Sequence, residues 1–261
     1  MDEALRQLAQ LVTEKISKTV KKETKKNFYK CGKTVGVGAF GSPTTYIDKV
    51  AEDVAIDILE HADVKVNLFS EEAGFVDFDG TYVFVLDPVD GTRNAYRGIP
   101  FYSVSLAVGT SRMTDIEYGI VKNIPTGDVF TAEKGKGAFL NKHPIRVCEV
   151  PSSDMISSIS LGKNHTTQTG RLSKKGNVRS LGSASLEMCM VAIGALDYYF
   201  VGREIIRVID IAASTLIVRE AGGIVKNLTG DELDMEFSLS DRTSVVAACS
   251  EELIKQILSG A

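Results

Sequence analysis

The sequence is poor in several residue types that mark common classes of protein. Tryptophan is absent and only three histidines occur in 261 residues, which argues against a histidine-based triad or a structural zinc site. The four cysteines form no CxxC pair, so reduced cytosolic thiols are expected at Cys31, Cys148, Cys189 and Cys249. No apolar run approaches the ~18 residues that span a bilayer, and the N-terminus lacks the pattern of a signal peptide. We therefore expect a cytoplasmic protein.

A large excess of charge of either sign is also absent from the sequence. The chain has 30 Lys+Arg against 34 Asp+Glu, a formal net charge of −4, whereas a surface that coats nucleic acid needs a positive field. Hydrophobic residues make up 44% and charged residues 25%, the mix of an ordinary globular protein. The composition therefore predicts a protein with neither nucleic acid nor a membrane as its partner.

The first half reads as helices followed by an antiparallel sheet. Apolar steps predict a helix over 2–22 with Leu11 or Val12 inward, and the basic run that follows is a solvated helix end. Residues 31–41 are rich in glycine and predict a mobile loop. Ser42-Pro43 should open a helix that ends near Leu59. Its inward face is expected at Val50, Val54 and Ile58.

Strands alternate with turns between these helices and residue 140. Alternation over 64–69 predicts a strand, the continuous apolar run 82–86 predicts a central buried strand, and 101–140 predicts an antiparallel meander. After about residue 150 the pattern becomes α/β. We therefore expect an N-terminal α+β subdomain (1–150) and a C-terminal α/β subdomain (151–261) that share one core.

A glycine pattern at residues 36–41 matches G-x-G-x-x-G. A dinucleotide site also needs a buried strand before the first glycine, and the preceding Lys30-Cys31-Gly32-Lys33-Thr34 is polar. A flexible loop is the better interpretation, although a dehydrogenase stays open as an alternative.

Acidic residues end the buried strand 82–86. Asp87-Pro88-Val89-Asp90-Gly91-Thr92 places two carboxylates three residues apart on a turn, an arrangement that suits Mg²⁺, and they would repel each other without a cation. Glu71-Glu72 ends the neighbouring strand, and Asp210 opens an otherwise apolar helix. For Asp210 the alternative is a purely structural role as the N-cap of that helix. The pattern indicates one metal site built from distant segments.

These motifs together resemble the inositol monophosphatase-like, metal-dependent sugar phosphatases. The resemblance covers nearly the whole chain and rests on Glu-Glu after a strand, D-P-x-D-G-T, D-I-A-A at 210–213, E-A-G-G at 220–223 and G-S-A-S-L-E-M-C at 182–189. It is strongest to the archaeal branch that hydrolyses both fructose 1,6-bisphosphate and inositol 1-phosphate. Ile209 replaces the tryptophan that many members have before the metal-binding aspartate. The resemblance implies a layered αβαβα sandwich with an antiparallel first sheet and a smaller mixed second sheet.

The resemblance also implies a set of metal ligands. A first Mg²⁺ would be held by Glu71, Asp87, the Val89 carbonyl and Thr92, and a second by Asp87, Asp90 and Asp210. A third, weaker ion would rest largely on Glu71, and Mn²⁺ is a possible substitute. Two cations ~3.5–4 Å apart can clamp a phosphate and activate water.

Asp48 matches the catalytic T-x-x-x-D motif of the family. It would hydrogen-bond Thr92 and help orient or deprotonate the attacking water, with Glu71 as a further catalytic carboxylate. Gly91 and Thr92 begin a helical turn whose N–H groups suit a phosphate, and the loop 32–41 would act as a lid. An ordinary surface carboxylate is the alternative for Asp48.

Substrate choice rests on different residues. The position seven residues before Asp210 is Arg203, which resembles the archaeal branch, and Arg179 and Ala184 match substrate contacts there. Surface salt bridges are the alternative for both arginines. Four basic residues of a polar stretch could steer polyanions more weakly: Lys163, Arg171, Lys174 and Lys175.

The expected activity is Mg²⁺-dependent hydrolysis of fructose 1,6-bisphosphate and of inositol 1-phosphate by a homodimer. Two alternatives remain open. One is a phosphatase for NADP(H) or phosphoadenosine, and the other is a non-catalytic regulator that binds a metal or inositol phosphate.

Overall fold

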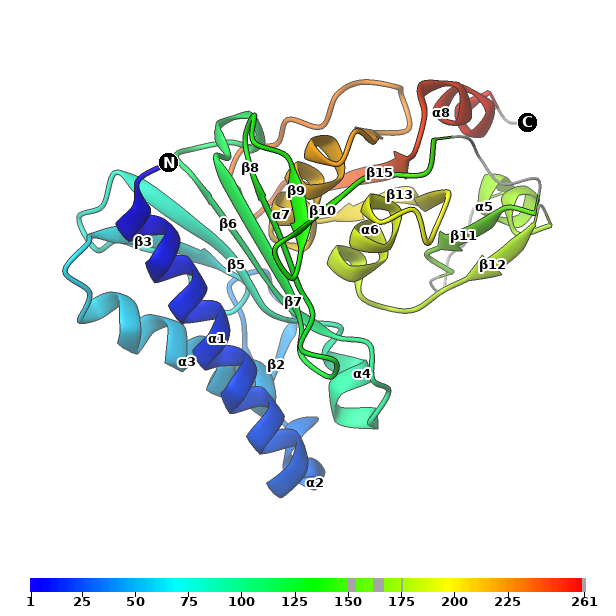
Figure 1. Cartoon of the computed structure of the whole chain (residues 1–261). Coiled ribbons are helices and arrows are strands. Elements are labelled where there is room, and N and C mark those ends of the chain that lie inside the picture. The colour runs from blue at the N-terminus through cyan, green and yellow to red at the C-terminus, as the bar shows by residue number, and fades with distance from the viewer. Residues whose placement is uncertain (150–153, 162–166, 175, 260–261) are drawn as a thin grey trace.

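A computed structural model describes residues 1–149, 154–161, 167–174 and 176–259 (Figure 1). Its larger sheet is built from the strands β3 (Val66–Ser70), β4 (Gly74–Val76), β5 (Tyr82–Asp90), β6 (Ser103–Gly109), β7 (Tyr118–Asn123), β8 (Val129–Glu133), β9 (Ala138–Leu140) and β10 (His143–Ile145). Their order is β10-β9-β8-β7-β6-β5-β3-β4. Neighbours are antiparallel except β3 and β5, which run parallel. The predicted meander over 101–140 is thereby confirmed.

The smaller sheet lies in the second half of the chain. It contains β11 (Ile156–Ile159), β12 (Asn177–Arg179), β13 (Tyr198–Ile206), β14 (Ile224–Lys226) and β15 (Thr243–Ala248). Their order is β12-β11-β13-β15-β14, with parallel pairing on one side of β13 and antiparallel pairing on the other. The expectation of a smaller mixed sheet is confirmed.

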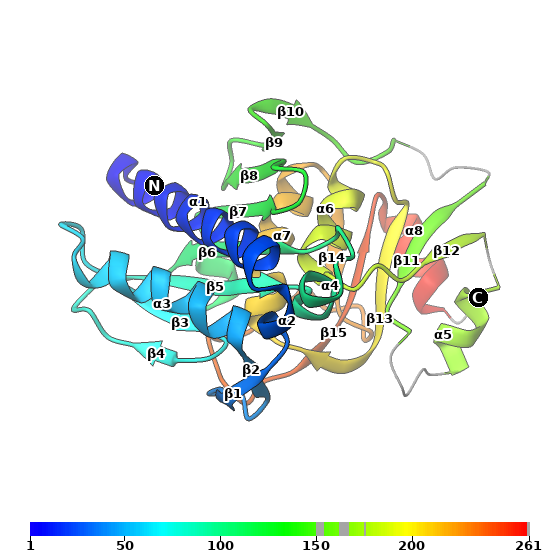
Figure 2. The same ribbon diagram turned by 90° about the horizontal axis from the view of Figure 1, so that it is seen from below.

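Helices form three layers around the two sheets (Figures 1 and 2). α1 (Glu3–Lys26) and α3 (Tyr46–Glu60) contact the first sheet on one face, and α7 (Val208–Glu220) contacts its other face. α6 (Ala184–Ala192) packs on α7 and reaches β13 and β15. α5 (Thr167–Leu172) and α8 (Glu251–Leu258) contact the second sheet. The layers are those of the expected αβαβα sandwich.

The core explains why α7 is apolar around its whole circumference. Every residue from Val208 to Val218 is buried, because the helix lies between the two sheets. One cluster of buried side chains joins Phe69 and Val85 of the first half to Leu186 and Ile211 of the second. The division into 1–150 and 151–261 stays a prediction, and this shared cluster makes the chain one packed unit. None of the described helices is long and apolar enough to cross a bilayer.

Two predictions for the first half were wrong in detail. Residues 31–41 were expected to form a loop, but β1 (Thr34–Val37) pairs with β2 (Pro43–Thr45) in a hairpin. The helix after it begins at Tyr46, because Thr45 caps it through a reciprocal pairing with Asp48. A glycine-rich segment that alternates Val with Gly can therefore pair as a strand.

The inward faces of the first two long helices also needed correction. Val12 is buried in α1 and Leu11 is 44% exposed, so the second of the two alternatives is correct. In α3 the expected inward residues Val50, Val54 and Ile58 are only half-buried. The buried face instead carries Ile47, Asp48, Ala51, Glu52, Ala55 and Leu59. Because two of these residues, Asp48 and Glu52, are carboxylates, the buried face of α3 does not coincide with its apolar residues.

Short helices complete the chain. α2 (Phe28–Cys31) follows α1, α4 (Thr92–Arg97) follows β5, and a single 3₁₀ turn, η1, covers Met113–Asp115. The polar stretch 161–177, expected to be a loop, contains α5 and the start of β12 in its described part. Lys163 and Lys175 lie outside the described residues, while Arg171 lies in the last turn of α5.

Candidate active site

The two aspartates after the apolar part of β5 lie on a bulge. Asp87 is paired with Ser105 of β6 and Asp90 with Ser103, so three steps on β5 oppose two on β6. Residues three apart in a regular strand point to opposite faces, and the extra residue cancels that alternation. Asp87 and Asp90 are 2% and 8% exposed. The bulge therefore brings both buried carboxylates to the same side.

Asp90 is held by the start of α6, ninety residues later in the chain. Its carboxylate accepts hydrogen bonds from Ser183 Oγ at 2.6 Å, from Ser185 N at 2.8 Å and from Ala184 N at 3.3 Å. Ser185 Oγ also donates to it and lies 2.8 Å from Ser103 Oγ. The helix N-terminus adds partial positive charge beside this carboxylate. The small-residue turn thus fixes one aspartate of the site.

Glu71 reaches the same place because β3 is parallel to β5. Ser70 is the register partner of Leu86, so Glu71, just after β3, and Asp87 of β5 are the next positions along the two adjacent strands. The turn after β3 is fixed by Glu52 of α3, whose carboxylate accepts from Glu72 N at 3.1 Å and Ala73 N at 3.0 Å. Glu72 itself accepts from the Thr44 hydroxyl. This turn therefore directs Glu71 toward Asp87.

Asp210 comes from the first turn of α7 and is paired with an arginine that sequence reasoning missed. Arg207 N donates to Asp210 Oδ2 at 2.8 Å, and Arg207 Nη2 lies 2.6 Å from Asp210 Oδ1. Nη1 of the same guanidinium pairs with Glu71. Arg207 stands three residues before Asp210 between apolar neighbours, and that helix-start spacing was the signal available.

Burial makes the site electrostatically unusual. It raises the pKa of Glu71 to about 7, and Arg207 opposes this rise. Burial also raises the pKa of Asp87 well above its usual range, and the charges of Glu71, Asp90 and Asp210 add to it. The pKa of Asp90 is raised by burial against its serine hydrogen bonds. Although burial alone lowers the pKa of Arg207, Asp210 and Glu71 raise it above the ordinary value. The four carboxylates therefore share one field and favour a cation.

Asp48 and Thr92 meet at the edge of this cluster. The Thr92 hydroxyl lies 2.8 Å from Asp48 Oδ1 and 2.9 Å from the Val89 carbonyl oxygen, so the expected contact between Asp48 and Thr92 is present. Asp48 Oδ2 accepts from Thr45 Oγ1 at 2.6 Å. Burial raises the pKa of Asp48. Gly91, in the left-handed region, caps α4 as expected of the helical turn at Thr92.

The tip of the β1–β2 hairpin lies against the acidic turn. Ala39 N donates to the Glu72 carbonyl at 2.9 Å, and a Cβ on Gly38 would lie 2.2 Å from Glu72 Oε2. The Phe40 ring centroid is 5.2 Å from Arg207 Cζ and equally far from Arg242 Cζ. Gly38 therefore lies close to the Glu72 carboxylate, and the hairpin reaches the ion-paired arginine.

The predicted substrate residues lie apart from this cluster or at its edge. Ala184 is part of the turn that holds Asp90. Arg203 is exposed on β13, where pairing with β15 is interrupted between Val201 and Ile206. Arg179 is exposed at the end of β12 and donates to the Val178 carbonyl.

The donor set suits a hard divalent cation. Carboxylate, carbonyl and hydroxyl oxygens are the ligands that Mg²⁺ prefers. The single guanidinium of Arg207 cannot neutralise all four buried carboxylates. In the described part of the chain no three of these acids have oxygens within 4.8 Å of one another. Arg207 lies between Glu71 and Asp210, so tight coordination requires it to withdraw.

Comparison with known proteins agrees with this geometry. The profile of the inositol monophosphatase family matches residues 1–260. The chain belongs to this family. A member from Methanothermobacter thermautotrophicus, fructose-1,6-bisphosphatase/inositol-1-monophosphatase, is 40% identical over 241 residues, which cover 87% of this chain and 86% of that protein.

Two further matches describe how far the family resemblance extends. A bifunctional NADP phosphatase/NAD kinase from Methanococcus maripaludis is 38% identical over 271 residues, with 94% of this chain covered but only 47% of that protein. The crystal structure of an inositol monophosphatase–fructose 1,6-bisphosphatase superposes with a TM-score of 0.85 at 31% identity, covering 100% of both chains. The family and its sandwich fold, expected from the motifs, are confirmed.

Proposed function

We propose that this chain is a Mg²⁺-dependent phosphomonoesterase that hydrolyses fructose 1,6-bisphosphate to fructose 6-phosphate and inositol 1-phosphate to inositol. The observation that carries the proposal is the convergence of Glu71, Asp87, Asp90 and Asp210 from three distant segments into one buried field. The activities named for the Methanothermobacter relative support the choice of substrates.

Different sets of residues would hold each metal ion. Glu71, Asp87 and the Val89 carbonyl would hold one ion, and Asp87, Asp90 and Asp210 a second. A third, weaker ion would rest on Glu71, and Mn²⁺ could replace Mg²⁺. When bound, these ions supply charge neutralisation of the phosphate and a nucleophilic water at neutral pH. Phosphoryl transfer depends mainly on such positioning and charge stabilisation, so no covalent enzyme intermediate is needed.

Asp48 and Thr92 would together accept the proton that the attacking water loses. Thr92 is oriented by Asp48 Oδ1 and by the Val89 carbonyl, and its hydroxyl can pass a proton to the carboxylate. Burial raises the pKa of Asp48, which makes it a better proton acceptor than an exposed aspartate. Asp90, Gly91 and Thr92 would also contact the substrate phosphate.

Substrate choice would fall to Ala184, Arg179 and Arg203. Ala184 adjoins the Asp90 carboxylate and would back the sugar. The two arginines are exposed, and a guanidinium can pair bidentately with a second phosphate. We also propose that the enzyme works in the cytoplasm as a homodimer.

A second candidate function is supported by one relative. The resemblance to a bifunctional NADP phosphatase/NAD kinase keeps hydrolysis of the NADP(H) phosphate open as the main activity. The test is kcat/KM for fructose 1,6-bisphosphate, inositol 1-phosphate and NADP⁺, each with Mg²⁺, Mn²⁺ or EDTA. We expect metal-dependent turnover that is fastest on the sugar and inositol esters. A strong preference for NADP⁺ would favour the second candidate, and turnover unaffected by EDTA would refute the metal mechanism.

A further inference from the structure

A second group of titratable side chains lies where β13 begins and β15 ends. Tyr198 of β13 is paired with Ala248 of β15, so Asp197 and Cys249 are the next pair along the ladder. Cys249 N donates to the Asp197 carbonyl at 3.2 Å, which extends that pairing by one step. The sheet itself therefore places a carboxylate and a thiol side by side.

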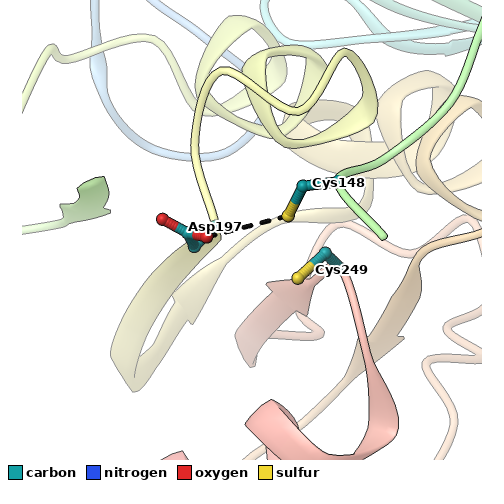
Figure 3. Close-up of side chains that lie close together, drawn as sticks. All are labelled: Cys148, Asp197 and Cys249. Atoms are coloured by element: carbon teal, nitrogen blue, oxygen red, sulfur yellow. Dashed lines mark hydrogen bonds between the residues drawn. The ribbon is translucent and has the colours of Figure 1, made fainter. Parts of the chain in front are cut away.

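Cys148 completes the group from the chain that crosses between the two sheets. It follows β10 of the first sheet, and its Sγ donates to Asp197 Oδ1 at 3.7 Å (Figure 3). Val147 N donates to the Ala221 carbonyl at 3.1 Å, and Gly194 packs closely on Cys148 N. Both contacts hold the crossing segment in place beside the sheet.

The three ligand atoms are close to the spacing that a tetrahedral ion requires. One oxygen and two sulfurs lie within 4.8 Å of one another. With Zn–S bonds of about 2.3 Å and Zn–O bonds near 2.1 Å, tetrahedral ligands stand roughly 3.5–3.8 Å apart. The Cys148–Asp197 pair already has that separation, and Cys249 needs a shift of about 1 Å or less.

The surroundings favour a soft ion over a hard one. Asp197 and Cys249 are each 6% exposed, and Cys148 is half-buried. Ile156 N donates to Asp197 Oδ2 at 2.8 Å and so orients the carboxylate, as outer contacts of metal ligands commonly do. Burial raises the pKa of the Cys148 thiol to about 12, and Cys249 and Asp197 add to the rise. Only an ion with high thiolate affinity can displace that proton, which excludes Mg²⁺.

We propose that Cys148, Asp197 and Cys249 form a binding site for a soft divalent ion of the Zn²⁺ class, with water as fourth ligand at the half-exposed side. Binding replaces two thiol protons by the metal, so two protons are released per ion. The ion ties the crossing segment to the two central strands of the second sheet. The scattered cysteine spacing hid this site, because only the folded sheet brings the residues together.

The test is Co²⁺ and Zn²⁺ titration of the full chain after chelator treatment and reduction, with Mg²⁺ in excess. Co²⁺ bound by thiolates gives near-ultraviolet charge-transfer absorption, which an all-oxygen site cannot give. We expect this absorption to saturate at one equivalent, two protons to be released, and Zn²⁺ to raise the Tm and abolish the signal.

Matched serine variants separate the site from the other thiols. Cys148→Ser should weaken Zn²⁺ affinity by about 100-fold or more, and Cys249→Ser likewise, whereas Cys31→Ser in α2 should leave the signal intact. Circular dichroism and hydrolysis of inositol 1-phosphate verify that each variant is folded. Wild-type protein without the charge-transfer absorption, or an unchanged signal in folded Cys148→Ser, would overturn the proposal.

Discussion

The acidic cluster around Asp90 lies at the start of α6, and the group of Cys148, Asp197 and Cys249 lies beyond its end. The two differ in their ligand atoms and in their charge. At the start of the helix, Ser183 and Ser185 hold Asp90 in a field of carboxylates with a guanidinium between two of them. Beyond its end, Asp197 lies beside the thiols of Cys148 and Cys249. Oxygen donors in one cluster and sulfur donors in the other should therefore select different ions from the same solution.

The strongest test of this contrast is Asp87→Asn. A metal clamp is worth several kcal/mol, so losing the shared ligand should lower kcat/KM by about 10³-fold or more. The Co²⁺–thiolate absorption should stay unchanged. Asp53→Asn, on the exposed side of α3, is the matched control and should keep full activity. Activity retained in Asp87→Asn would contradict the proposed mechanism.

Arg207→Gln should affect stability and metal affinity in opposite directions. Without metal, Glu71 and Asp210 lose their cation, which should cost about 3 kcal/mol and lower the Tm in EDTA. With Mg²⁺, no guanidinium has to be displaced, so calorimetric affinity should rise by about tenfold. Arg219→Gln, at the other end of α7, pairs with the exposed Glu232 and should change neither quantity. Weaker Mg²⁺ binding in Arg207→Gln would show that the arginine supports the ions.

The pH dependence of Mg²⁺ binding should report Glu71. Its pKa is raised from 4.5 to about 7 by burial, so the folded protein holds a proton there that the unfolded chain has lost between those values. Stability without metal should therefore fall, on this account, as pH rises from 4.5 to 7. Mg²⁺ needs the ionised form, so its apparent affinity should increase about tenfold from pH 6 to pH 8. Isothermal titration in two buffers of different ionisation enthalpy measures the proton released, and a flat profile would refute the assignment.

The smallest expected effect concerns Arg203→Glu. The reversal of charge should lower kcat/KM for fructose 1,6-bisphosphate more than for inositol 1-phosphate, by roughly fivefold in the ratio. Only the bisphosphate offers a second phosphate for a guanidinium. Glu204→Gln, at the neighbouring exposed position, is the control. Equal losses on both substrates would remove Arg203 from substrate selection.

The acidic cluster was readable from the sequence because its residues follow strands and open a helix. The apolar run before Asp87, and the alternation before Glu71, each identify a strand whose end carries an acid, and parallel neighbours end at the same edge. The hydrogen bond between Asp48 and Thr92 was implied instead by the resemblance to the family.

What escaped prediction depends on contacts between distant segments. The inward face of α3 was misplaced because Asp48 is buried beside Thr92 and Glu52 against the turn after β3, which periodicity of apolar residues cannot reveal. Arg207 was overlooked because its partner Glu71 lies 136 residues away. Cys249 meets Asp197 through sheet register, and Cys148 comes from the segment that crosses between the sheets, so no spacing along the chain encodes the group.

The hydrogen bonds from the start of α6 to Asp90 also affect when the acidic cluster can form during synthesis. Ser185 N–H bonds a side chain 95 positions earlier, so a nascent chain that has completed the larger sheet still lacks one anchor of its acidic cluster. Until the ribosome has released that helix, Asp90 is a carboxylate without its serine and amide donors. Competence to capture a divalent ion should therefore arise late in synthesis, because Asp210 of α7 follows α6 in the chain and must emerge as well.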